Sequence, residues 1–331
     1  MGIFLSGMSD QAKRDAIAAL PTAKRDAIMH RALPGARVDG QSLPNAIANA
    51  GADFRVETRP ILAVLDAERA VEVRNRFATV RMDTGEPLGV VGNGYAVSQT
   101  LAQLAPVAVL VERGDAQLAT VAVAKGGAKV RVSAFLGSSI IGQLPGSAGP
   151  DVLAHFGLFE ASHDGESSTT GALQTLRVVC LNGLTTWDTV AKYSVRHTLN
   201  GEQRVAEAAR LMLGLKSAAA AEVAQFQMMH QARMSLHQFR AFAHSLLEAA
   251  RGKLASERAQ AIRKVEVDDL CDLFTGGKGN SGSSLWDGYN SVTEWIDHRV
   301  RKNGAPAHTF ESSRFGAGNA LKSRALRMLT R

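Results

Sequence analysis

Residues 117–136 read QLATVAVAKGGAKVRVSAFL, and this stretch decides the class of fold. Val, Ala, Leu and Thr dominate positions 117–124 and 128–136, which favours two β-strands. Lys125-Gly126-Gly127 between them is typical of a hairpin connection, because glycine adopts the backbone angles that tight turns require. We therefore predict an antiparallel pair of strands at the centre of the chain.

Further elements flank this hairpin on both sides. We predict strands over 54–58, 71–80 and 152–161, and helices over about 99–113 and about 167–188. The order is strands, helix, hairpin, strand, helix, and it predicts an α+β fold with an antiparallel sheet and packed helices. Pro106 should interrupt the first of the two helices.

The second half of the chain has a different character. From Glu202 to about Thr275 nearly every residue favours helix, and further helices are predicted near 287–302 and 317–330. Before the sheet, Ala12–Ile17 recurs as Ala23–Ile28 with a period of eleven residues, which predicts two short helices. We expect three parts: a helical arm over 1–36, an α+β sheet domain over 37–200, and a helical region over 201–331 with a basic end.

Composition limits the class of protein. The chain has 331 residues, 45% of them hydrophobic, as expected for a folded globular protein. Two cysteines cannot form a disulfide framework, so we expect a reduced, cytoplasmic setting in a bacterial cell. No apolar run approaches the roughly 20 residues that span a bilayer, and no signal peptide is apparent, so we expect no membrane partner.

Charge is concentrated at the C-terminal end. The net charge is +7, and residues 299–331 hold eight Lys and Arg against one acid, Glu311. Such a segment indicates contact with polyanions, nucleic acid first. The alternative is an ordinary solvated helix face.

Two predicted strands also carry basic residues on one face. Arg74 and Arg76 alternate with apolar residues, and so do Lys129 and Arg131. If these strands are neighbours, one sheet face presents a basic track for a nucleic-acid backbone. The alternative is cross-strand ion pairing, which Glu72 on the same face favours. The candidate phosphate contacts are Arg74, Arg76, Lys129, Arg131, Arg177, Lys322, Arg324 and Arg327.

Ser162-His163-Asp164-Gly165 follows the strand predicted over 152–161. A histidine beside a carboxylate suits general base chemistry, which makes His163 and Asp164 the alternative catalytic pair. His155 lies eight positions earlier and could share a face with His163, which keeps a metal site open as an alternative. However, adjacent strand residues point to opposite faces, and Asp-Gly is a common turn dipeptide, so we favour a structural corner.

Two other features, Cys180 and the glycine-rich loop over 276–284, are not expected to take part in catalysis or nucleotide binding. Cys180 lies in an apolar run, which favours a buried and inert thiol. The glycine-rich loop over 276–284 lacks the spacing and the preceding strand of a phosphate-binding loop of nucleotide hydrolases. We therefore expect no cofactor, and an enzymatic role is less favoured than a binding role.

Several separated motifs resemble the phage/plasmid-like protein family catalogued as domain-of-unknown-function family 932. They are Val80–Gly85, Leu88–Val91 with Tyr95, Ser162–Gly165, Arg177–Asn182, Arg196–Thr198, Trp286–His298 and Gly316–Gly318. Gly183 departs from the small hydroxyl residue expected after Asn182. The resemblance implies an origin in phages, prophages or plasmids and implies no established activity. The order of elements is also similar to the core of phage single-strand annealing proteins.

These observations lead to three expectations of function. The first is a nucleic-acid-binding protein, with single-stranded DNA as the ligand in recombination or replication. The second is a metal-dependent hydrolase or nuclease that uses His155, His163 and Asp164. The third is an interaction protein that acts on host processes, such as a defence antagonist. Self-association as a homo-oligomer stays open.

Overall fold

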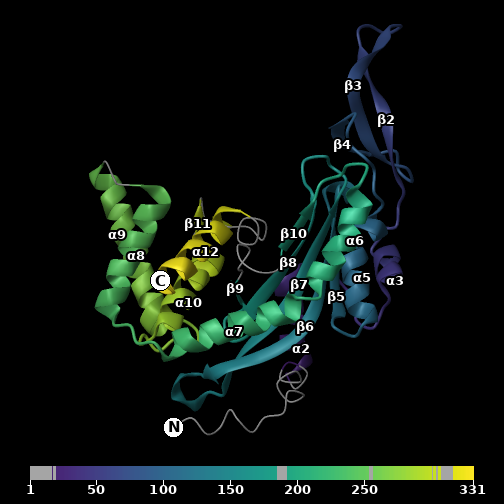
Figure 1. The fold of residues 1–331 in the computed structure, drawn as a ribbon. Coiled ribbons are helices and arrows are strands. Elements are labelled where there is room, and N and C mark those ends of the chain that lie inside the picture. Colours follow the sequence, from purple (N-terminus) through teal and green to yellow (C-terminus); the bar gives the residue numbers. More distant parts are fainter. Residues whose placement is uncertain are drawn as a thin grey trace.

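The computed structural model describes residues 17, 20–184, 192–252, 256–299, 301–302, 305–306 and 316–331. A large antiparallel sheet forms the body, a narrow β-arm projects from one end of it, and helices gather at the other end (Figure 1). The α+β class predicted from the sequence is confirmed. The first repeat, Ala12–Ile17, lies almost wholly outside the described residues, whereas the second lies in helix α2 (Thr22–Ala32).

The predicted central hairpin is confirmed. It consists of β5 (Gln117–Ala124) and β6 (Lys129–Gln143), joined by a short turn in which Gly126 has a φ of 66°. The main sheet has the order β1-β5-β6-β7-β8-β10, with β9 on β8, and every pairing is antiparallel. The other strands are β1 (Ala36–Arg37), β7 (Pro150–Ser162), β8 (Thr169–Arg177), β9 (Asn182–Leu184) and β10 (Lys192–Val195).

The helix predicted over 167–188 is wrong where the structure describes the chain. Residues 169–177 form β8 and residues 182–184 form β9, while 185–191 lie outside the described residues. β8 is buried almost throughout, so it lacks the polar alternation that marks a half-exposed strand. Gly171 has a packing role there, because a Cβ at this position would lie 2.3 Å from the ring of Tyr193.

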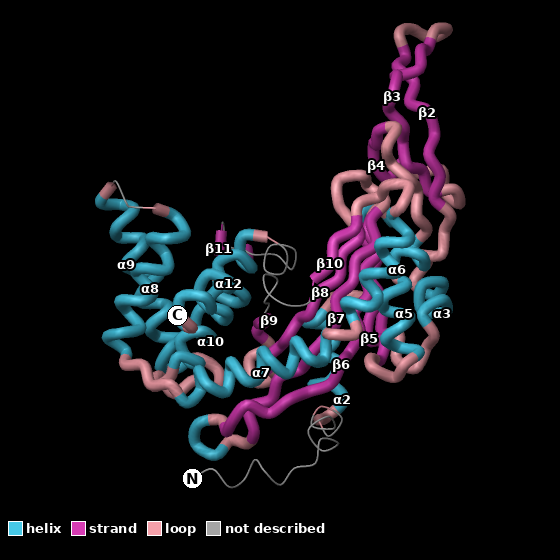
Figure 2. Tube along the Cα trace, viewed as in Figure 1, coloured by secondary structure: helices cyan, strands magenta, loops and turns pink. Residues whose placement is uncertain are grey.

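A second, three-stranded sheet forms the arm. It contains β2 (Val56–Val64), β3 (Ala70–Arg81) and β4 (Pro87–Gly92) in that order, and the β2–β3 hairpin extends well beyond the body (Figure 2). The basic pairs of the sequence therefore lie on different sheets. Arg74 and Arg76 are on β3, and Lys129 and Arg131 are on β6, so the continuous basic track over neighbouring strands is not formed.

Short helices cover the N-terminal half of the sheet. They are α3 (Leu43–Asn49), α4 (Thr100–Gln103) and α5 (Ala105–Glu112). The interruption predicted at Pro106 is confirmed, since α4 ends before it and Pro106 stands in the first turn of α5. Their apolar side chains pack with Val121, Val130 and Val132 of the hairpin in one core.

The helical C-terminal region is confirmed as well. It contains α6 (Gly201–Met212), α7 (Leu215–Gln231), α8 (Leu236–Arg251), α9 (Glu257–Gly276), α10 (Leu285–Glu294), one π-helical turn η3 (Trp295–Arg299), and α12 (Ala317–Leu329). Ser235 and Ser284 each begin a helix with a reciprocal capping box. The core under these helices also contains Ile141 of β6 and Leu153 of β7. The long central strands therefore pack against the C-terminal helices at their far end. None of the helices among the described residues has the length and apolar character to cross a bilayer.

Candidate functional site

The Ser162–Gly165 corner lies where the arm joins the body. β7 ends at Ser162, and the backbone N–H of His163 donates to the carbonyl of Ala128 at 2.8 Å. From the arm, the Thr79 hydroxyl donates to the His163 carbonyl at 2.7 Å. Gly89 of β4 lies so close that an added Cβ would be 2.1 Å from the Asp164 carbonyl oxygen. The corner therefore fixes the foot of the arm.

The His163 ring is buried in a satisfied hydrogen-bond network. Its Nε2 lies 3.1 Å from the Thr100 hydroxyl, and the Gln103 amide lies behind it. Gln103 accepts from the Ser162 N–H at 2.9 Å and donates to the Ser98 carbonyl at 2.8 Å. Burial lowers the pKa of His163 to about 4, so the ring is neutral at neutral pH. Sequence reasoning missed Thr100 and Gln103, because nothing in their spacing marks them as partners of a histidine 60 residues away.

Asp164 closes the turn that follows β7. Its Oδ1 accepts from the Ser162 hydroxyl at 2.7 Å and from the backbone N–H groups of Glu166 and Ser167 at 2.9 and 3.0 Å. Burial raises the pKa of this carboxyl, but these hydrogen bonds outweigh it and hold the pKa below its usual value. This geometry is that of an Asx turn, in keeping with the structural interpretation of the corner.

His155 and His163 do not meet. Eight positions along a strand span about 26 Å, whereas ligands of one zinc ion each lie about 2 Å from it. Instead, His155 Nδ1 and Nε2 lie 3.0 Å from the hydroxyls of Thr175 and Ser139. Among the described residues, no group of three His, Cys, Asp or Glu could hold a metal ion.

Four of the predicted phosphate contacts lie on the body or in the core and have carboxylate partners. Arg131 Nε donates to Glu160 at 2.6 Å, and Lys129 lies 3.4 Å from the same carboxylate. Arg177 and Lys322 are fully buried, and each forms a 2.6 Å ion pair, with Asp151 and Asp297 respectively. These four side chains bind protein carboxylates in the structure, and Arg177 and Lys322 do not reach the surface at all.

Arg177 and Asp151 connect the sheet to the C-terminal helices. Both Asp151 oxygens accept from Arg177, and the Trp286 indole donates to the same carboxylate at 3.0 Å. The guanidinium also bonds the Asn280 side chain at 2.8 Å and the Gly279 carbonyl at 2.7 Å. The buried Arg177 therefore holds the glycine-rich loop against the sheet, and its role is structural.

Of the other four candidates, Arg74, Arg76 and Arg327 are exposed and Arg324 is partly buried. Arg324 donates to the Ala249 carbonyl at 2.6 Å and is half-buried. Arg327 is exposed on α12. Arg74 and Arg76 project from the arm, and neither has an ion pair with a described carboxylate. By contrast, Arg55, Arg59 and Arg69 pair with carboxylates close to them in the chain.

A cavity of ≈ 510 Å³ lies at the foot of the arm, beside the corner. Three chain segments line it: Gly92 to Tyr95 after β4, the turn over 165–168 after β7, and 196–198 after β10. A smaller cavity of ≈ 240 Å³ adjoins it and shares Arg196, His197 and Thr198. The Tyr95 and His197 rings pack with their centroids 5.1 Å apart. Residue spacing gave no sign that these three segments meet.

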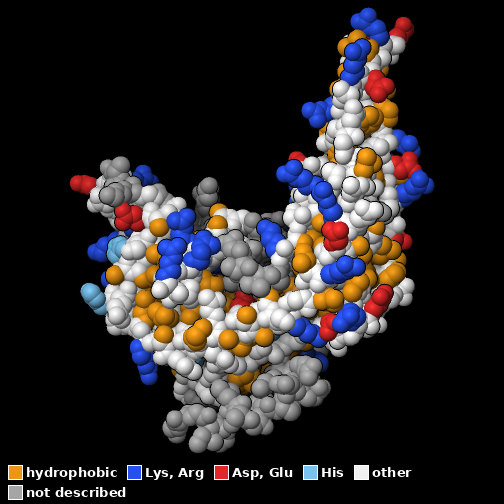
Figure 3. All heavy atoms as spheres, viewed as in Figure 1, with side chains coloured by type: hydrophobic (Ala, Val, Ile, Leu, Met, Phe, Trp, Pro, Cys, Tyr) orange, Lys and Arg blue, Asp and Glu red, His pale blue; other side chains and the backbone are white. Residues whose placement is uncertain are grey.

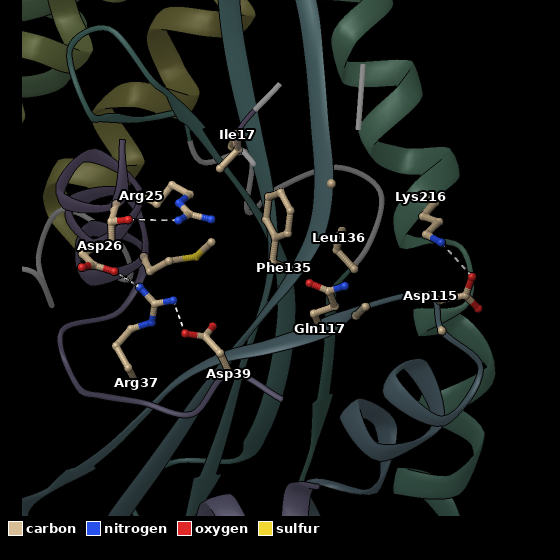
Figure 4. Close-up of a pocket in the computed structure, with 15 residues that line it drawn as sticks. Ile17, Arg25, Asp26, Arg37, Asp39, Asp115, Gln117, Phe135, Leu136 and Lys216 are labelled. Carbon is tan, nitrogen blue, oxygen red and sulfur yellow. Dashed lines mark hydrogen bonds and ion pairs between the residues drawn. The ribbon is translucent and has the colours of Figure 1, made fainter. Parts of the chain in front are cut away.

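A larger cavity of ≈ 660 Å³ lies between α2, β5, β6 and α7 (Figure 4). Its floor includes Phe135, and Arg37 at its rim pairs with Asp26 and Asp39. On the opposite side, the ammonium group of Lys216 lies 2.9 Å from Asp115. With Arg25, the lining holds three basic and three acidic side chains, so the cavity has no clear preference for a charged ligand.

Comparison with known proteins gives a family and no activity. The sequence model of the DUF932 family, described as a domain of unknown function, matches residues 87–325. No curated protein and no solved structure matches the chain. The matched span contains the corner, the cavity at the foot of the arm and the C-terminal helices, whereas α2, α3, β2 and β3 lie before it.

Proposed function

We propose that this chain, which belongs to the DUF932 family, is a nucleic-acid-binding protein with single-stranded DNA as its ligand. One observation carries the proposal: the β2–β3 arm projects from the body and presents Arg74 and Arg76, neither of which pairs with a carboxylate of the described residues. An exposed guanidinium without an internal partner is free to bind a phosphate. We further propose a phage or plasmid origin and a role in recombination or replication.

The distribution of charge supports this proposal. Lys and Arg side chains lie on both sides of the hollow between the arm and the C-terminal helices, and on the arm they alternate with Asp and Glu side chains (Figure 3). The net charge of +7 favours the approach of a polyanion. Since phosphate contacts carry no sequence information, we expect binding with little sequence preference.

Fluorescence anisotropy of labelled single- and double-stranded oligonucleotides tests the proposal. We expect binding to the single strand that weakens steeply between about 50 and 200 mM salt, because bound counterions are released. The Arg74→Glu/Arg76→Glu variant should lose at least about tenfold in affinity, since two contacts become repulsive. The matched control is Arg258→Glu/Lys264→Glu on the exposed face of α9, which changes net charge by the same amount.

The comparison of the two variants decides the outcome. Equal losses in both would mean that net charge, and not the arm, governs binding. No binding by the wild type at low salt would refute the proposal. Tighter binding to the duplex would keep a nucleic-acid partner and exclude the single strand as the preferred ligand.

A second candidate function is a protein contact through the arm. Leu62, Val64 and Val71 near its tip are 59%, 75% and 46% exposed. Exposed apolar side chains grouped on one element are typical of interaction surfaces. Light scattering of the wild type and of Leu62→Asp/Val64→Asp tests self-association: a loss of mass in the variant would identify the arm as the contact between copies, and a monomeric wild type would exclude a homo-oligomer.

A further inference from the structure

The cavity at the foot of the arm is lined by hydrogen-bond donors. Tyr95, Ser167, Ser168 and Thr198, which carry hydroxyl groups, belong to its lining, together with Arg196. Arg196 is exposed and has no ion pair with a described carboxylate. Glu166 is the acid in the lining, and it lies 3.9 Å from Lys125 on the surface. The chemistry of the lining therefore suits an anion.

Two polar atoms beside this cavity lack a hydrogen-bond partner in the part of the chain that the structure describes. The Tyr95 hydroxyl and His197 Nε2 are buried and have no hydrogen-bond partner among the described residues. Buried polar atoms are nearly always hydrogen-bonded, because leaving one unpaired costs about 1–3 kcal/mol. Burial raises the pKa of Tyr95, so its hydroxyl keeps its proton and can donate. Tyr95 and His197 therefore hold two unsatisfied polar atoms beside one cavity, and a ligand that reaches them would complete their hydrogen bonds.

The neighbouring carboxylate is compensated only in part inside the protein. Asp164 directs Oδ1 to three donors of its own turn, and its Oδ2 lies 3.8 Å from the ammonium group of Lys129. Oδ2 has no hydrogen-bond partner among the described residues, and the Asp164 charge acts on Tyr95 and His197, so Arg196 must supply the attraction that an anion needs here. His197 is neutral at neutral pH, since burial lowers its pKa, and its Nε2 can donate in one of the two tautomers.

We propose that this cavity binds a phosphate group through Tyr95, Arg196 and His197. A guanidinium at the mouth with hydroxyl donors inside is the arrangement that recognises phosphate oxygens. On the proposed function, the phosphate is one phosphodiester of the strand that the arm holds, since the residues that line the cavity lie where β4 and β7 end, beside the foot of the arm. A free phosphate would offer the same chemistry, and the experiment separates the two sources.

The test uses the full chain with two probes, a single-stranded oligonucleotide and inorganic phosphate. For the oligonucleotide, Arg196→Gln should weaken binding about tenfold and reduce the salt slope by about one, because one phosphate contact is lost. Tyr95→Phe should weaken binding several-fold and leave the salt slope unchanged, since a neutral donor is lost. The control is Arg204→Gln, an exposed arginine on nearby α6, which should stay within about twofold of the wild type.

For inorganic phosphate, the readout is the NMR signal of the His197 ring, which should shift in the wild type and much less in Arg196→Gln. A thermal melt of each variant confirms folding. If the oligonucleotide binds but neither substitution changes its affinity or salt slope, and phosphate leaves His197 unmoved, the cavity inference is overturned and the proposed function stands. If phosphate shifts His197 while no oligonucleotide binds, the cavity is a site for free phosphate and the proposed function fails.

Discussion

Arg177→Met should destabilise the protein strongly, because it removes one partner of a buried ion pair. Arg177 and Asp151 are 1% and 0% exposed, and Arg177 Nη2 and Nε lie 2.6 and 2.9 Å from the carboxylate. After the substitution, Asp151 keeps the Trp286 indole as a donor but loses its counter-charge. Breaking a buried pair in this way costs about 3–5 kcal/mol, and the Asn280 and Gly279 contacts are lost as well.

Urea unfolding followed by circular dichroism measures this change. The double variant Arg177→Met/Asp151→Asn should recover a large part of the loss, because no uncompensated charge stays buried. Arg240→Met is the control: its 2.6 Å pair with Asp268 is exposed, so stability should stay close to that of the wild type. Wild-type stability of Arg177→Met together with weakened oligonucleotide binding would refute the structural role and make Arg177 a nucleic-acid contact.

Three further outcomes follow from buried groups. Burial lowers the pKa of His155 and His163 from 6.5 to about 4, so as the pH falls the unfolded chain binds protons before the folded one does. The free energy of unfolding should therefore be at its full value above pH 6.5 and should fall by about 3 kcal/mol for each ring as the pH drops to 4. Gly89→Ala should lower stability by about 1–3 kcal/mol in thermal unfolding, because its Cβ would meet the Asp164 carbonyl. Cys180 should resist iodoacetamide at pH 8 in the native protein, since burial raises its thiol pKa to about 12.

A specific result would contradict each of these three predictions. A His155→Gln variant with the same loss of stability in acid as the wild type would show that this ring does not titrate on unfolding. Gly94→Ala, where an added Cβ meets open space, is the control for Gly89→Ala, and equal effects would remove the steric argument. Labelling of Cys180 at the rate of the unfolded chain, seen by peptide mass spectrometry, would show that its surroundings open.

Local signals predicted much of the fold. The Lys125-Gly126-Gly127 turn and the proline at 106 placed the hairpin and the helix break correctly, because both depend on the backbone of a few adjacent residues. The segment over 169–177 was mistaken for helix because it lacks the alternation of polar and apolar residues that marks a half-exposed strand. It is buried almost throughout because β7 and β10 pair with it on either side, and the sequence of the segment does not reveal these neighbours.

The candidate site was harder to predict than the fold. Lys129 and Arg131 look like free cations in the sequence, but β7 brings Glu160 opposite Arg131 in the register. Likewise, the partner of Arg177 is Asp151 on the next strand, and the partner of Lys322 is Asp297 on η3. A charged residue can be assigned to the surface or the core only when its partner is known, and these partners are distant in sequence.

The length of β6 and β7 has a consequence for folding during synthesis on the ribosome. Ile141 and Leu153 belong to one core with Phe239 and Trp286, which the ribosome adds only after the strands of the main sheet have been made. Until then, α7 covers the far end of the β6–β7 pair in this core without the helices that follow it, and the apolar surface left open is of the kind that chaperones bind and that aggregates when synthesis stops early. A chain released before α8 should therefore precipitate even though every strand of its main sheet is present. Synthesis of the last helices is then the step that buries this apolar surface and protects the nascent protein from aggregation.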